Sequence, residues 1–204
     1  MKSRILFLIL FLIAAVLLTA MCAAQTTTPA PAYSKFEFSV GYDRLWNNVS
    51  IADLAPSNLK TTFLSGLNGA DIGATFNFKP TVGLKLDFSA NTQSGNFTTS
   101  GKNYSFAVGP VIKKHSGKFN PFGEMLVGVA HQSVSGFSVS GGQNAFTAIA
   151  GGGIDVKLSQ HISVRPVEAD YVWTAYHTVK PTDFLIISSR QNNFRYVGGL
   201  VFTF

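Results

Sequence analysis

The chain of 204 residues has a single cysteine, few charged side chains and, after residue 18, no long apolar run. Because Cys22 has no second cysteine to pair with, a disulfide within the chain is excluded. Only 13% of the residues are charged, roughly half the share in an ordinary soluble domain. Apolar residues make up 46% of the chain, and 18 of them are Phe. These values disfavour both an ordinary soluble enzyme and a disordered chain.

The amino terminus has the layout of a secretory signal peptide. Lys2 and Arg4 precede an apolar run from residue 5 to residue 18, and small residues follow it. As a helix this run would be about 21 Å long, short of the ~30 Å hydrocarbon core of a bilayer. We therefore expect cleavage to remove residues 1–24 and Cys22 with them. What remains is a flexible linker at residues 25–33 and one domain at residues 34–204.

The charge of the mature chain gives no sign of nucleic-acid binding. Without Lys2 and Arg4, 14 basic residues face 10 acidic ones, for a net charge of +4. The basic residues are scattered, and the nearest approach to a cluster is Lys113, Lys114 and Lys118. A nucleic-acid binder would gather such charges on one face or in one run, so no nucleic-acid partner is expected.

From Tyr33 onward the dominant pattern is alternation of apolar and polar residues. Phe36, Phe38 and Val40 occupy one parity, for example, while the residues between them are polar, as in a strand with one apolar face. In the seventh such segment the parity switches after Pro166, which predicts a β-bulge at Pro166 and Val167. The eight segments span residues 35–43, 70–78, 82–91, 103–112, 124–130, 146–157, 162–173 and 193–204.

Alternation alone fits both a soluble barrel with an apolar interior and a membrane barrel with an apolar exterior. Glycines are frequent on the polar parity, which suits the narrow lumen of a small barrel. Short connections at 79–81, 114–120 and 158–161 alternate with long ones at 47–66, 94–102, about twelve residues after Gln132, and 177–191. Aromatic residues gather near the segment ends, as in the girdles at membrane interfaces: Tyr42, Trp46, Phe78, Phe88, Tyr104, Trp173, Tyr176, Phe194 and Tyr196.

The sequence therefore predicts an all-β fold, an eight-stranded antiparallel up-and-down transmembrane β-barrel. Only a closed barrel satisfies the backbone hydrogen bonds of strands within a membrane. Its apolar face would contact lipid, with the short connections and both termini in the periplasm.

The carboxyl terminus carries a family resemblance. Gly199, Leu200, Phe202 and Phe204 are similar to the terminal strand signal of outer-membrane barrels, although Val197 stands where that signal usually has a polar residue. The stretch 151–174 resembles porin-like outer membrane protein beta-barrel domain proteins of the outer membrane protein A type. The resemblance implies integral location in the bacterial outer membrane. It also implies the barrel-assembly machinery, membrane lipids and lipopolysaccharide as partners; it specifies no activity, and the surface partner stays unidentified.

The inward parity carries charged residues that a barrel must pair. A short connection would set Asp155 opposite Arg165, and barrel closure would bring Arg195 near Asp43. The network is either an ion gate or a salt-bridged plug, and the narrow lumen of eight strands favours the plug, with at most minor pore activity. Its predicted members are Glu37, Asp43, Asp71, Lys85, Asp87, Glu124, Asp155, Arg165, Glu168, Asp170 and Arg195.

We expect no enzyme, and no catalytic, cofactor or metal site, because the four His residues show no metal-ligand spacing. Two alternatives stay open. His131 and Ser133 share a strand face and are similar to the pair of lipid A deacylase barrels, which would make the protein a lipid-modifying enzyme, but no acid is evident within reach. A soluble barrel that binds an apolar ligand would show the same alternation.

Overall fold

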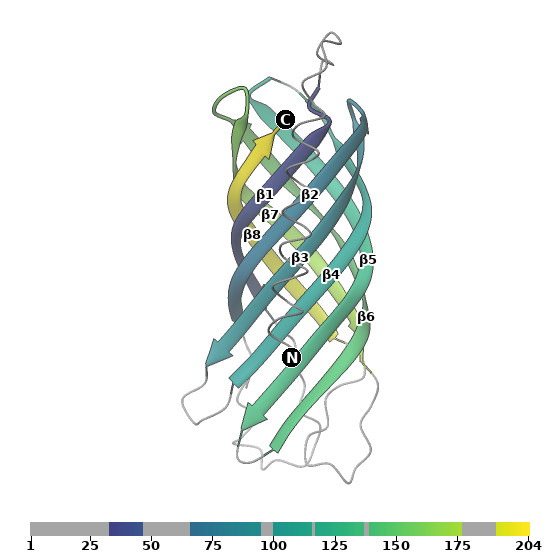
Figure 1. Cartoon of the computed structure of the whole chain (residues 1–204), viewed down its shortest axis with the longest axis vertical. Helices are drawn as coiled ribbons and strands as arrows, with labels where there is room; N and C mark the ends of the chain where they lie inside the picture. The colour runs from purple at the N-terminus through teal and green to yellow at the C-terminus, as the bar shows by residue number, and fades with distance from the viewer. Residues whose placement is uncertain (1–32, 47–65, 95–99, 116, 137–138, 177–190) are drawn as a thin grey trace, which may run out of the picture.

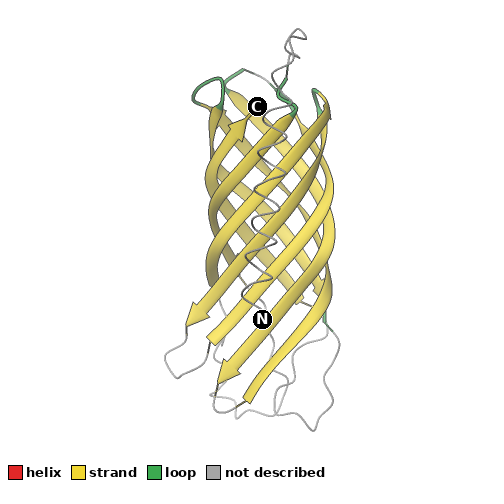
Figure 2. Cartoon of the chain, viewed as in Figure 1, coloured by secondary structure: helices red, strands yellow, loops and turns green. Residues whose placement is uncertain are grey.

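The computed structural model describes residues 33–46, 66–94, 100–115, 117–136, 139–176 and 191–204, so the expected signal peptide lies outside the described residues. Eight strands form one closed barrel (Figures 1 and 2). They are β1 (Phe36–Trp46), β2 (Leu67–Lys79), β3 (Val82–Ser94), β4 (Ser100–Lys113), β5 (Phe119–Gly136), β6 (Val139–Lys157), β7 (Ile162–Ala175) and β8 (Gln191–Thr203). Within the described ranges, no helix has the length and apolarity needed to cross a membrane.

Each strand pairs antiparallel with its neighbour in the chain, and β8 closes on β1. Val40 of β1 is opposite Ile72 of β2 on one side and Leu200 of β8 on the other. The backbone N–H of Phe204 donates to the carbonyl of Phe36 over 2.9 Å, which completes the seam. Both edges of every strand are thus paired, as membrane insertion requires. The predicted eight-stranded up-and-down barrel is confirmed.

The alternation separates an apolar exterior from a polar interior. Outward side chains such as Met125 and Phe106 are 68% and 49% exposed, whereas the inward Asp87 between two outward apolar residues of β3 is fully buried. Such alternation recurs in all eight strands because successive side chains point to opposite faces. It is interrupted where the ladder shifts register, between β2 and β3, β6 and β7, and β7 and β8. The apolar face is therefore the outer surface of the barrel, and the inward face is mainly polar and charged.

The register of β7 contains the predicted bulge. Arg165 is opposite Gly199 of β8, and Glu168 is opposite Val197, so two β7 residues lie across from the single Gly198 and β7 has one extra residue. The two β7 residues are Pro166 and Val167, and both are exposed. The bulge keeps Arg165 and Glu168 on the inward face although they are three positions apart, which confirms the bulge prediction.

The two ends of the barrel differ. The carboxyl terminus and the start of β1 lie at one end together with the turns at residues 80–81, 114–118 and 158–161 (Figure 1). We call this the turn end and the opposite end the loop end. In the turn between β4 and β5, Gly117 has a φ of 74°, a left-handed conformation that favours glycine.

Two expectations about the loop end are wrong. Strands β5 and β6 continue far beyond Gln132 and pair as far as Gly136 and Val139, so residues 137–138 alone separate them where about twelve were expected. Ser and Gly fill this stretch and hide the apolar alternation, yet the two strands still form a regular ladder. Tyr176, expected on the aromatic exterior, is 4% exposed because it continues the inward parity of Val172 and Thr174 just beyond the end of β7.

Candidate functional site

The barrel interior contains a dense group of buried charges. Among the described residues, eight carboxylates and four basic side chains are buried, and every strand contributes at least one of them. Their places follow from the alternation, which turns each of these residues inward. The carboxylates are Glu37, Asp43, Asp71, Asp87, Glu124, Asp155, Glu168 and Asp170, and the bases are Lys85, Lys113, Arg165 and Arg195.

Arg195 of β8 joins the most carboxylates. Its Nε donates to Asp170 Oδ2 over 2.8 Å. Its two terminal nitrogens each donate to one oxygen of Asp87, over 2.8 and 3.3 Å. One of these nitrogens also lies 3.4 Å from Asp71, and the other lies 3.5 Å from Glu168. Arg195 is therefore the point where strands β2, β3, β7 and β8 are tied together, with a bidentate pair at its centre.

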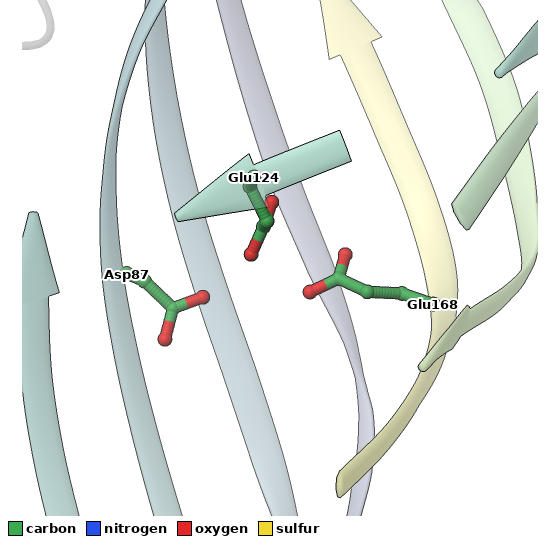
Figure 3. A group of neighbouring side chains, drawn as sticks. All are labelled: Asp87, Glu124 and Glu168. Atoms are coloured by element: carbon green, nitrogen blue, oxygen red, sulfur yellow. The ribbon is translucent and has the colours of Figure 1, made fainter. Parts of the chain in front are cut away.

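Three carboxylates, those of Asp87, Glu124 and Glu168, lie close together in the lumen (Figure 3). Lys85 contacts all three of them. One oxygen from each of the three lies within 4.8 Å of the others, an arrangement that resembles a metal site. The Lys85 ammonium, however, is 2.9 Å from Glu124, 3.1 Å from Glu168 and 3.3 Å from Asp87. The Lys85 ammonium therefore occupies the position that a metal ion would take among these three carboxylates.

Toward the turn end the network continues through Arg165 and Lys113. Arg165 Nε is 2.7 Å from Asp155 Oδ1, and one of its terminal nitrogens is 2.5 Å from Glu168. Lys113 pairs with Glu37 and lies 2.8 Å from Asp155. Because Glu168 pairs with both Arg165 and Lys85, these ion pairs form one continuous network from the turn end to Lys85.

An aromatic side chain supports the bases at this end. The Arg165 guanidinium lies 4.3 Å from the centroid of the Phe122 ring, and Lys113 Nζ lies 5.7 Å from it. Glu37 also accepts a hydrogen bond of 2.9 Å from the side chain of Asn77. Both cations thus contact a ring face as well as carboxylates, which partly replaces the water they lose on burial.

Two further features define the lumen. A cavity of about 540 Å³ opens at the turn end, and Glu37, Lys113 and Asp155 form part of its lining. The interior also holds an apolar cluster, which the sequence analysis did not foresee: Leu45, Leu67, Ala107, Leu126, Ile149 and Val172. The lumen is thus filled by ion pairs and by packed aliphatic side chains.

The structure brings together all but one of the side chains expected in the network. Asp155 and Arg165 form the pair proposed from the short connection between β6 and β7. The expected approach of Arg195 to Asp43 gives no ion pair, although Arg195 lies near enough to attract the Asp43 carboxylate electrostatically. Arg195 lies opposite Leu45 in the ladder and extends toward β2 and β3, where Asp71 and Asp87 bind it.

Sequence reasoning overlooked Lys113, Phe122 and Asn77. Lys113 was considered only with Lys114 and Lys118, as the nearest approach to a basic cluster, although its position on the polar parity of β4 could have placed it inside. Phe122 precedes the stretch of β5 in which alternation is visible, and it is an aromatic residue on the inward face. Extending the parity of Glu124 and Leu126 toward the start of β5 would have placed it inside.

The residues of the two other hypotheses are placed as follows. His131 lies exposed on the outward face of β5, and its Nδ1 is 2.6 Å from Asn144 Oδ1. Ser133 lies two residues farther along and is opposite Lys102. In the terminal strand, Leu200 and Phe204 are exposed, whereas Gly199 packs against the backbone of Val40 on β1. Phe202 is half-buried.

Comparisons with solved structures show the same fold. Neisserial surface protein A is 12% identical, with a TM-score of 0.59 over 85% of this chain and 100% of that one. The attachment invasion locus protein Ail of Yersinia pestis is 15% identical, with a TM-score of 0.54 over 84% and 99%. Outer membrane protein OprG of Pseudomonas aeruginosa is 12% identical, with a TM-score of 0.52 over 84% and 96%.

The sequence itself carries the family assignment. No curated protein matches the chain in a sequence search. The profile of the outer membrane protein beta-barrel domain, in contrast, matches residues 13–190. With its closed barrel and apolar exterior, the chain belongs to the outer membrane protein beta-barrel domain family, whose members are integral proteins of the outer membrane.

Proposed function

We propose that the protein is a non-enzymatic outer-membrane barrel with a structural or surface-interaction role and a largely closed lumen. The observation that carries this proposal is a buried ionic network that takes charged side chains from all eight strands. A barrel of eight strands has an interior just wide enough for side chains to fill. The network therefore acts as a plug that fixes strand register, and pore activity is minor at most.

The arrangement of contacts favours a plug over a gate. Each of the four bases contacts at least two carboxylates, so no single side-chain movement opens a path. Breaking one partner out of a buried pair costs about 3–5 kcal/mol, because an uncompensated charge stays behind. A gate needs a second arrangement of similar energy, and the aliphatic cluster around Leu126 leaves little room for one.

We further propose that the turn end, with both termini, faces the periplasm and that the loop end faces outward. This orientation matches the short periplasmic turns and longer outer loops of such barrels. The exposed apolar band would contact membrane lipids, and basic loop residues would meet lipopolysaccharide phosphates. The barrel-assembly machinery would recognise Gly199, Leu200, Phe202 and Phe204.

The enzymatic alternative lacks a component. A His–Ser pair needs an acid to orient the His, and the side-chain partner found for His131 is the neutral amide of Asn144. The described carboxylates are all buried in the lumen, on the other side of the barrel wall. His131 is more simply a polar residue near the outer rim.

Planar-bilayer recording tests the closed lumen. We expect purified protein to show at most brief, small openings. Lys113→Ala and Arg165→Ala remove the bases nearest the turn-end cavity and should raise conductance if these side chains occupy the path. Lys79→Ala, at an exposed position at the end of β2 and outside the lining of this cavity, is the matched control and should behave as the unchanged protein. Sustained, large openings of the unchanged protein would contradict the proposal.

A further inference from the structure

The charged side chains of the barrel surface are distributed unevenly. All eight carboxylates of the described residues are buried in the lumen. The two remaining acidic residues, Asp53 and Asp183, lie outside the described ranges, in the sequence between β1 and β2 and between β7 and β8. Those strand ends are at the loop end (Figure 1). The described part of the turn end therefore has no exposed carboxylate side chain.

Exposed lysines, in contrast, gather at the turn end. Five of them lie at strand ends or in turns there. Lys157 lines the cavity at this end, and the other four do not. We call these four the basic arc: Lys35 before β1, Lys79 at the end of β2, Lys114 after β4 and Lys118 before β5.

Backbone hydrogen bonds connect the segments that carry the basic arc. The carbonyl of Lys35 accepts a bond of 2.8 Å from the N–H of Asn77, near the end of β2. The N–H that precedes Lys114 along the strand donates to Thr81 over 3.0 Å, and that of Lys114 donates to Pro121 of β5 over 2.9 Å. Because β1 to β5 are consecutive in the barrel, the four lysines follow one side of its circumference.

The basic arc adjoins the apolar outer surface. Three of its lysines are immediate chain neighbours of Phe residues that are 42 to 55% exposed: Phe36, Phe78 and Phe119. Lys114 lies two residues beyond Ile112, which is 65% exposed. A lysine at the edge of an apolar band lays its aliphatic stem along that band and extends its ammonium into the polar layer beyond it. The four ammonium groups are thus placed at the level of lipid head groups.

The arc lacks a counter-charge within the described part of the protein. The ion pairs of the described residues all lie inside the lumen. An ammonium offers three N–H donors and binds phosphate as a point charge. A zwitterionic head group brings its own cation to compete for its phosphate, whereas the head group of an anionic phospholipid does not. The chemistry of the arc therefore favours a lipid with net negative charge.

We propose that the basic arc binds the phosphate groups of anionic phospholipids in the leaflet that surrounds the turn end. This inference rests on the proposed function as a membrane barrel, and the proposed orientation makes that leaflet the periplasmic one. A soluble anionic partner would have no need of lysines beside exposed Phe residues, which is why a lipid fits this surface better. The inference does not depend on a closed lumen.

The expected effect follows from the charge of the arc. A lysine near an anionic membrane surface strengthens attachment roughly fivefold. Exposed charges are screened by salt, so the four contributions together stay well below their product. We therefore expect the whole arc to favour an anionic over a zwitterionic lipid by at least about fivefold, and this preference should fall as the salt concentration rises.

Native mass spectrometry of lipid-bound protein tests the proposal. The folded full barrel is placed in mild-detergent micelles with equal amounts of phosphatidylglycerol and phosphatidylcholine of identical acyl chains, so that the two lipids differ only in their head groups. The spectrum gives the ratio of bound phosphatidylglycerol to bound phosphatidylcholine, and the heat-induced gel shift checks that each variant is folded. We expect the unchanged protein to retain phosphatidylglycerol preferentially.

Two sets of variants make the test specific. Replacing all four lysines of the arc with Gln should lower the ratio at least about fivefold, whereas replacing them with Arg should preserve it because the charge remains. Lys118→Gln and Lys157→Gln form a matched pair, since the Lys157 N–H donates to the Lys118 carbonyl over 2.8 Å and only Lys118 belongs to the arc. Lys118→Gln should lower the ratio, and Lys157→Gln should leave it unchanged. This pair decides the question if the fourfold Gln variant does not fold.

Three results would overturn the proposal. An unchanged protein without a preference for phosphatidylglycerol would leave the arc to a soluble anionic partner. A fourfold Gln variant with the full preference would show that the arc does not hold the lipid. An equal loss in Lys157→Gln and Lys118→Gln would show that overall charge, and not the arc, selects it. None of these results bears on the closed lumen, which bilayer recording measures separately.

Discussion

Replacing Arg195 with Met removes the charge that ties four strands together and keeps a side chain of similar length. Arg195 pairs with Asp87 and Asp170 at 2.8 Å and with Asp71 at 3.4 Å. Two charges about 4 Å apart interact with about 4 kcal/mol at an effective dielectric constant of about 20. The desolvation that the guanidinium no longer suffers offsets part of this loss, so we expect a net destabilisation of about 3–5 kcal/mol.

Urea unfolding in detergent micelles measures this change. Trp46 and Trp173, the two tryptophans of the chain, report unfolding by fluorescence. Lys157→Met, at an exposed site, is the control and should change the free energy of unfolding by less than about 0.5 kcal/mol. If the cost of Arg195→Met comes from stranded carboxylates, adding Asp170→Asn should recover part of it.

The reasoning fails if Arg195→Met costs less than about 1 kcal/mol with an unchanged denaturant slope. That result would mean that the carboxylates around Arg195 are protonated or hydrated in the native barrel. The reasoning also fails if Asp170→Asn worsens the Arg195→Met variant, since removing a stranded carboxylate should relieve repulsion.

Four further changes have defined outcomes. Lys85→Ala vacates the three carboxylates of Figure 3 and should make the thermal midpoint depend on calcium, as a calcium titration of the gel shift would show. Gly151→Ala should cost about 1–3 kcal/mol in urea unfolding, because the new Cβ would lie 2.0 Å from Asp170 Oδ1 and 2.5 Å from a backbone carbonyl. Deletion of Phe204 should slow assembly into the outer membrane, measured as the folded fraction in a pulse-chase gel shift; a normal rate would count against the terminal signal. His131→Ala should leave the acylation pattern of outer-membrane lipid unchanged by mass spectrometry, and an altered pattern would revive the enzymatic hypothesis.

Much of the fold was predictable because membrane strands obey one simple rule. A strand with one face in lipid and one in the lumen alternates strictly, and any slip of register would place charges such as Asp87 in lipid. Even the bulge at Pro166 was visible, because a bulge shifts the parity of everything after it. The rule failed at the loop end of β5 and β6, where the sequence is rich in Ser and Gly and shows no alternation.

The sequence predicts which charged residues face the lumen, but it does not predict which of them form ion pairs with one another. Parity places Arg195 and Asp43 inside, yet it does not say how far a long side chain extends across the lumen. Arg195 spans the interior to Asp87, which is 108 positions away in the chain, and leaves Asp43 without a base. Lys113 shows the converse error, because it was considered only in the search for a basic cluster although its parity on β4 turns it toward the lumen.

Thiol labelling of a cysteine placed in the middle of the lumen tests the closed, salt-bridged interior most directly. Ala107 is fully buried and lies opposite Asp87 in the ladder, and Ala107→Cys in a Cys22→Ala background gives a single thiol there. The account predicts that a small cationic thiol reagent leaves this cysteine unmodified in the folded barrel, whereas Lys157→Cys at the exposed rim reacts completely. Rapid modification of the Ala107→Cys thiol in folded protein would show an open lumen and contradict the account.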